Sequence, residues 1–152
     1  MELFSDLEIR IALQLFLAVL LGVTIGIERE VSGKEAGIRT YALVALGSAL
    51  FTIVGVETFR QFSIIGGISF DPSRIVNSIA LGIGFIGAGI IIYRNSHVEG
   101  VTTATGVWVA GAIGLAVGLE FYGIAIFATL LAFFVLSGLH PLKRWVREKK
   151  QE

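Results

Sequence analysis

The segment IALQLFLAVLLGVTIGIERE, residues 11–30, continues for 17 residues without a charge and then meets three charges in a row. A helix needs about 20 apolar residues to cross the hydrocarbon core of a bilayer. The segment therefore predicts a helix that crosses a membrane and ends at its boundary. Apolar runs of similar length recur at 38–59, 75–93, 101–119 and 121–139. The sequence as a whole predicts an all-α integral membrane protein with five transmembrane helices.

The composition supports a membrane protein. Hydrophobic residues make up 55% of the 152 residues, and only 16% are charged, against about 25% in soluble domains. The mean hydropathy is +0.83. We expect a transmembrane domain over 1–142 and a basic tail over 143–152. Because the chain opens with acidic residues and shows no cleavage site after the first run, that run is expected to be a permanent span rather than a signal peptide.

The distribution of Lys and Arg predicts the orientation. With five spans the two ends lie on opposite sides, and nine of these residues fall on the side of the C-terminal tail against three on the other. Cytoplasmic segments carry the excess of positive charge. We therefore expect the N-terminus outside and the C-terminus in the cytoplasm, with the tail resting on anionic lipid headgroups.

Several classes of function find no support in the sequence. There is no cysteine, and His97 and His140 have no second ligand at a spacing typical of zinc sites. The net charge of zero gives no sign of a nucleic-acid partner. No nucleophile and base are placed to converge, so we expect no enzyme and no cofactor. GIGFIG, residues 82–87, matches a dinucleotide-binding pattern on paper, but it lies inside an apolar run rather than after a strand.

Glycines at helical spacing predict close helix packing. In lipid, small residues allow helix backbones to approach, and this contact supplies much of the association energy. We expect the third and fourth spans to form the tightly packed centre, either within one chain or across a homodimer. The glycines concerned are Gly22, Gly26, Gly82, Gly84, Gly87, Gly89, Gly106, Gly111, Gly114 and Gly118.

Charges at the ends of the first two spans divide into two groups. Glu30, Lys34 and Glu35 are explained by orientation and solvation of a cytoplasmic loop. Glu28 and Arg39 each lie within a helical turn of an apolar run, where a partly desolvated charge needs a partner. An ion pair between these two is one hypothesis.

Oxygen-bearing residues near the other span ends have structural and functional interpretations. Asp71 before Pro72 has the pattern of a helix N-cap. Asp71 and Glu28 are also the candidate Mg²⁺ ligands, since hard cations prefer carboxylates, although the predicted topology puts them on opposite faces. The hydroxyls of Thr102, Thr103 and Thr105 either bond backbone carbonyls of the preceding turn, serve as cation ligands, or donate to Asn77 across the bundle.

The ordered set of motifs resembles the membrane region of the MgtC/SapB family over roughly residues 10–140. The matching pieces are GIERE at 26–30, GIRTYALVALGSALF at 37–51, DPSRI at 71–75, GIGFIGAGIII at 82–92 and VEGVTTATGVWVAGAIGLAVG at 98–118. Some members carry a soluble C-terminal domain, and any function housed there is expected to be absent here or supplied by another protein. The resemblance marks these residues as functional: Glu28, Arg29, Gly37, Arg39, Thr40, Asp71, Arg74, Gly84, Gly87, Gly89, Thr102, Thr103 and Trp108.

The resemblance implies a protein of the prokaryotic cytoplasmic membrane with a role in growth under magnesium limitation and, in some pathogens, in survival inside host cells. Two functions stay open. One is a non-enzymatic regulator or adaptor that binds another membrane protein. The other is a transporter of Mg²⁺ or another cation that works as a homo-oligomer, with a dimer favoured.

Overall fold

The computed structural model describes residues 5–63, 71–94 and 96–138, which form five helices and one short hairpin. The helices are α1 (Asp6–Val31), α2 (Ile38–Ser63), α3 (Pro72–Ile90), α4 (Val101–Gly118) and α5 (Tyr122–Phe133), and a π-helical turn, Phe134–Gly138, continues α5. The predicted basic tail, the domain boundary at residue 142 and the part of the second loop at 64–70 lie outside the described residues.

The helices confirm an all-α membrane protein. Helices α1 to α4 are long and apolar enough to cross a bilayer, and Tyr122–Gly138 forms a shorter apolar helix. The predicted third span was too long, because α3 ends at Ile90 and the chain then becomes extended. Strand β1 (Ile92–Arg94) pairs antiparallel with β2 (His97–Glu99), with Tyr93 opposite Val98.

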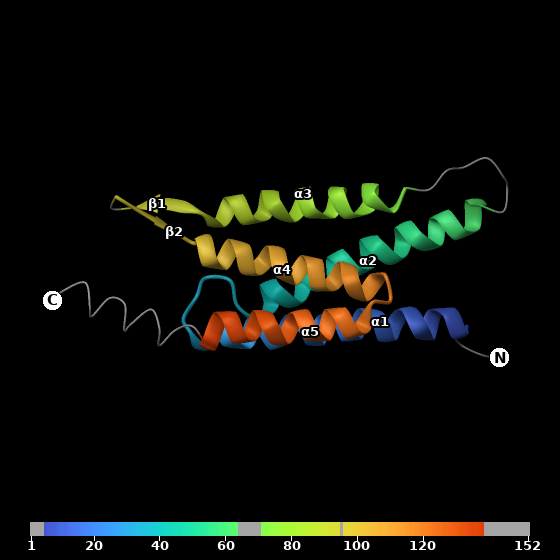
Figure 1. Ribbon diagram of the computed structural model, residues 1–152, viewed down its shortest axis with the longest axis horizontal. Helices are drawn as coiled ribbons and strands as arrows, with labels where there is room; N and C mark the ends of the chain where they lie inside the picture. The colour runs from blue at the N-terminus through green and yellow to red at the C-terminus, as the bar shows by residue number, and fades with distance from the viewer. Residues whose placement is uncertain (1–4, 64–70, 95, 139–152) are drawn as a thin grey trace.

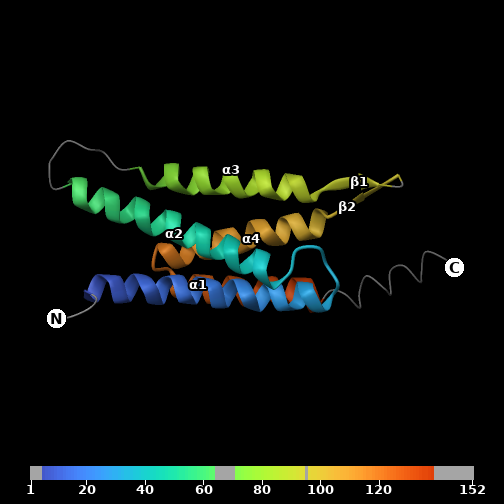
Figure 2. The ribbon, with the colours of Figure 1, turned by 180° about the vertical axis from the view of Figure 1, so that it is seen from behind.

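The helices form three layers, as Figures 1 and 2 show from opposite sides. Helix α3 lies on one side, α2 and α4 lie in the middle, and α1 and α5 lie on the other side. We call the end that holds the last turn of α1, the start of α2, the β-hairpin and the start of α4 the Arg29 end. The opposite end, where α3 begins and α4 turns into α5, is the Asp71 end.

Helix α4 forms the packed centre, as its glycines predicted. A Cβ at Gly118 would lie 2.6 Å from Thr52 Cβ, and one at Gly114 would collide with the Ala45 carbonyl. Helix α1 approaches α2 in the same way, because a Cβ at Gly22 would lie 2.6 Å from the Tyr41 carbonyl oxygen and one at Gly26 equally close to Ile38 Cα.

The prediction was wrong for α3 as part of the centre. Of the most apolar 18-residue window of each helix, 56% is buried in α4 but only 17% in α3. A Cβ at Gly87 would make ordinary contact with Ala104 of α4, 3.5 Å from its carbonyl oxygen, whereas Gly82, Gly84 and Gly89 have nothing within 4 Å of that position. These three glycines are on surfaces of α3 that no part of the described chain covers, so their spacing does not serve packing within the chain.

Candidate functional site

The last turn of α1 places Glu28 and Arg29 inside the bundle as a buried ion pair. Arg29 Nε donates to Glu28 Oε2 at 2.5 Å, and Nη2 donates to Oε1 at 2.8 Å. The side chains are only 3% and 7% exposed. The Ser32 hydroxyl, just beyond the helix, donates to Glu28 Oε1 at 2.8 Å. The pair is held by several directed bonds, as a buried pair must be to offset its desolvation.

The partner of Glu28 differs from the one we expected. Arg39 is exposed, and the ion pair of Glu28 is formed with its neighbour Arg29. The guanidinium of Arg29 matches a carboxylate in two-pronged geometry, which satisfies both oxygens from one direction. The interpretation of Glu30 was also incomplete, because its Oε2 accepts the backbone N–H of Ile38 at 3.1 Å and so caps the start of α2. Gly37 leaves room for that carboxylate, which a Cβ would meet.

Tyr41 joins this polar cluster to α4 and was not among the predicted site residues. Its ring is fully buried, and its hydroxyl donates to the Thr103 carbonyl oxygen at 3.3 Å. Gly106 makes room for the hydroxyl, since a Cβ there would collide with it. The sequence contained a signal, because Tyr41 directly follows the GIRT motif and Gly106 follows the threonines, but nothing in their spacing showed that they meet.

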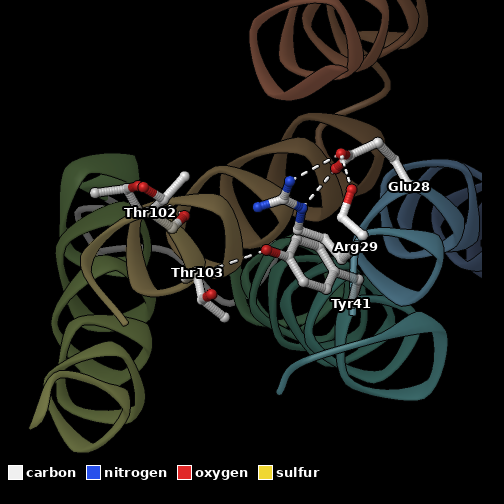
Figure 3. Close-up of polar contacts among 7 residues, drawn as sticks. Glu28, Arg29, Tyr41, Thr102 and Thr103 are labelled. Atoms are coloured by element: carbon white, nitrogen blue, oxygen red, sulfur yellow. Dashed lines mark hydrogen bonds and ion pairs between the residues drawn. The ribbon is translucent and has the colours of Figure 1, made fainter. Parts of the chain in front are cut away.

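A polar pocket of about 500 Å³ opens beside the ion pair. Its walls come from five segments: the end of α1, the loop after it, the end of the hairpin, the first turn of α4 and the π-helical turn after α5. The polar side chains that line it are Arg29, Lys34, Glu35, Glu99, Thr102 and Thr103. Figure 3 shows Arg29 between Glu28 on one side and the two threonines on the other. The pocket thus brings together residues of two separate sequence motifs, GIERE and VEGVTT, and of the loop after α1.

The threonines at the start of α4 differ in their environments. Thr103 is 4% exposed, whereas Thr102 and Thr105 are exposed. The Thr105 hydroxyl donates to the Thr102 carbonyl oxygen at 3.0 Å, which is the backbone bond predicted for these residues. The proposed bond from the threonines to Asn77 is wrong, because α3 and α4 run antiparallel and Asn77 lies near the Asp71 end.

Asp71 caps α3, as its sequence pattern predicted. Its Oδ1 accepts the Ser73 backbone N–H at 2.9 Å and the Ser73 hydroxyl at 2.6 Å. The hydrogen bond from the Ser73 side chain, followed by that from its backbone, lowers the pKa of Asp71 below the ordinary value of 3.8. Arg74 and Asn77 lie on the following turns and are exposed.

The structure does not bring the two candidate Mg²⁺ ligands together. Glu28 is at the Arg29 end, and Asp71 is at the other. Among residues 5–63, 71–94 and 96–138, no three His, Cys, Asp or Glu side chains gather as a possible metal site. Of the remaining predicted residues, Thr40 is half-buried, and Trp108 is half-exposed on the outside of α4.

The apolar helices, the packed glycine contacts and the buried charged pair at one helix end define a multi-pass α-helical membrane protein. The family model of the MgtC family matches residues 15–145. The chain belongs to this family, which confirms the family resemblance of its motifs.

Three named relatives resemble this chain over only part of their own length. It is 41% identical over 130 residues to "Putative magnesium transporter YhiD" of Escherichia coli K12, covering 86% of this chain and 60% of that protein. Protein SapB of Bacillus subtilis is 40% identical over 140 residues, covering 91% and 59%. Protein MgtC of Salmonella typhimurium LT2 is 39% identical over 119 residues, covering 78% and 48%. The chain thus spans about half to three fifths of these three relatives. No solved structure matches it.

Proposed function

We propose that the protein is a regulator or adaptor of the prokaryotic cytoplasmic membrane that acts in adaptation to low magnesium and has no enzymatic activity. In this proposal all five helices cross the membrane, with the N-terminus outside and the polar pocket at the Arg29 end facing the cytoplasm. The positive-inside distribution of Lys and Arg supports that orientation.

The observation that carries the proposal is the packed layer between the two ends of the bundle. Ala45, Ala49, Val107, Ala110 and Val117 are all 0% exposed, and they separate Glu28 and the threonines from Asp71 and Asn77. A cation passing through this layer would lose its hydration and meet no charged partner, because the buried polar side chains beside the layer, Ser48 and Thr52, are neutral. The arrangement therefore favours a protein that senses or binds at one end over one that conducts through its own interior.

A second candidate function, Mg²⁺ transport, is favoured by the name of the relative YhiD. That name describes the relative, and transport by this chain is a separate hypothesis. Because the interior of one chain is filled, a transporter of this fold would need its path between copies of a homo-oligomer.

Reconstitution into liposomes with a trapped Mg²⁺ indicator distinguishes the two functions. For a regulator we expect no flux above that of protein-free liposomes, while an added ionophore shows that the indicator responds. A saturable flux that Asp71→Asn removes, in protein that stays folded by size-exclusion chromatography, would establish transport instead.

The role of the pocket is tested by growth at low Mg²⁺ in a host strain that depends on the protein. Thr102→Val removes a hydroxyl from the pocket wall, and Thr105→Val removes one from the same helix turn outside it. We expect only Thr102→Val to impair growth, with equal amounts of both variants in the membrane. Equal growth of the two strains would count against a functional pocket.

A further inference from the structure

Helices α2 and α3 enclose an apolar groove that is separate from the polar pocket. Helix α3 packs on α4, where Ile83 fills the space beside Gly111, and it meets α2 closely where Ile75 reaches Gly55. Elsewhere the two helices stand apart and leave a space of about 770 Å³. Its walls include Leu43, Gly47 and Phe51 from α2 and Ile75, Gly82 and Ile86 from α3.

Two glycines widen the groove without serving the packing of the chain. Gly47 lies on one wall and Gly82 on the other, and a Cβ at either would have nothing within 4 Å. Glycine inside a helix costs about 0.5–1 kcal/mol relative to alanine. At the packed positions of this bundle a close backbone contact offsets that cost, as at Gly22 and Gly114, whereas Gly84 on the outer surface of α3 is as open as the groove glycines. In the groove no such contact exists, which indicates that the space is used by something outside the chain.

The groove has the length and the charge that suit a phospholipid. From Arg74 to Ile86 it follows α3 for 13 residues, or about 18 Å between the first and the last Cα. One leaflet supplies about half of the 30 Å hydrocarbon core. Arg74 lines the groove in the first turn of α3 and makes no ion pair with any described residue. The nearby carboxylate of Asp71 attracts Arg74 electrostatically, but it accepts its hydrogen bonds from Ser73.

We propose that the groove binds one phospholipid with an anionic headgroup, with an acyl chain between α2 and α3 and the phosphate on Arg74. The planar guanidinium binds phosphate oxygens in two-pronged geometry. A second copy of the chain fits less well, because a two-fold interface centred on the groove adds a second Arg74 and no acid from the groove walls. The proposal does not depend on the proposed function.

Native mass spectrometry of the full chain, titrated with phosphatidylglycerol or phosphatidylcholine carrying the same acyl chains, tests the proposal. We expect one phosphatidylglycerol to bind about fivefold more tightly than phosphatidylcholine, since a basic residue at the membrane surface contributes about 1 kcal/mol toward an anionic lipid. Gly82→Leu should abolish this binding by filling the groove. Gly84→Leu is the matched control, because its position is equally open but does not line the groove.

A second pair of variants tests the headgroup site at the end of the groove and leaves its apolar walls unchanged. Arg74→Gln should remove the preference for phosphatidylglycerol, whereas Arg94→Gln, an exposed arginine in strand β1, should keep it. Equal lipid binding by Gly82→Leu and Gly84→Leu would overturn the proposal. So would a Gly82→Leu variant that loses a dimer mass while its lipid binding is unchanged, because a second copy would then be the occupant.

Discussion

Replacing Arg29 with methionine is expected to destabilise the protein by about 3–5 kcal/mol, the cost of leaving a buried charge without its partner. Glu28, whose side chain is 7% exposed, would lose two charge-assisted hydrogen bonds of 2.5 and 2.8 Å and keep the Ser32 hydroxyl. Bonds of that kind contribute about 1.5–3 kcal/mol each, so the two estimates agree. Methionine retains most of the apolar stem, which separates the loss of charge from the loss of packing.

The assay is reversible unfolding by sodium dodecyl sulfate in mixed micelles, carried out as a double-mutant cycle. Glu28→Gln in the Arg29→Met background removes the buried carboxylate charge that has lost its arginine. The double variant should therefore lose about 1–3 kcal/mol less stability than the sum of the losses in the two single variants. Arg10→Met is the control, because Arg10 pairs with Glu120 at 3.6 Å with both side chains nearly half-exposed. Such a surface pair contributes about 0–1 kcal/mol. Equal losses for Arg10→Met and Arg29→Met, or strictly additive losses in the cycle, would refute the reasoning.

Three further predictions use the same purified protein. Gly114→Ala should lower the free energy of unfolding by about 1–3 kcal/mol, because the new methyl group collides with a backbone carbonyl of α2. Gly84→Ala, where no atom is near, should be neutral or stabilising by up to about 1 kcal/mol. A larger loss of stability for Gly84→Ala than for Gly114→Ala would contradict the packing described for α4. Tyr41→Phe should cost about 1 kcal/mol, the worth of its hydroxyl bond to α4, and an unchanged midpoint would show that the bond contributes nothing. Because the pKa of Asp71 is lowered in the folded protein, its stabilising effect is present above the ordinary value of 3.8 and is lost as the pH falls through the lower folded pKa. Carboxyl titration by NMR should show Ser73→Ala raising that pKa toward 3.8. Because alanine keeps the backbone N–H, an unchanged pKa in the variant would exclude the Ser73 hydroxyl bond as the main cause.

The sequence was sufficient for the features that depend on local pattern. Apolar runs located the helices, and Asp71 followed by Pro72 located the start of α3 with its cap. Glycine spacing identified α4 as closely packed. Each of these features depends on residues within one helix or at its end, where spacing translates directly into geometry.

Features that depend on contacts between distant segments were missed or misassigned. The buried pair of Glu28 with Arg29 was predicted with Arg39 instead, because sequence distance from an apolar run does not show which side chain points inward. Tyr41 looked like one aromatic residue among several in a span, although it reaches Thr103 across the bundle. The glycines of α3, like those of α4, recur at intervals typical of a helix face, but α3 lies on the outside of the bundle and only Gly87 of the four in α3 meets another helix.

The short hairpin between α3 and α4 has a consequence for biogenesis. These are the two least hydrophobic of the four long helices, with mean window hydropathies of 1.4 and 1.5 against 2.2 and 1.8 for α1 and α2. The paired strands β1 and β2 form a short connection between them. Gly100, with φ of 84°, is the N-cap of α4, and a Cβ there would collide with the last turn of α3. We therefore expect this less hydrophobic pair to insert into the membrane as one antiparallel unit, in which α4 covers the face of α3 that carries Gly87.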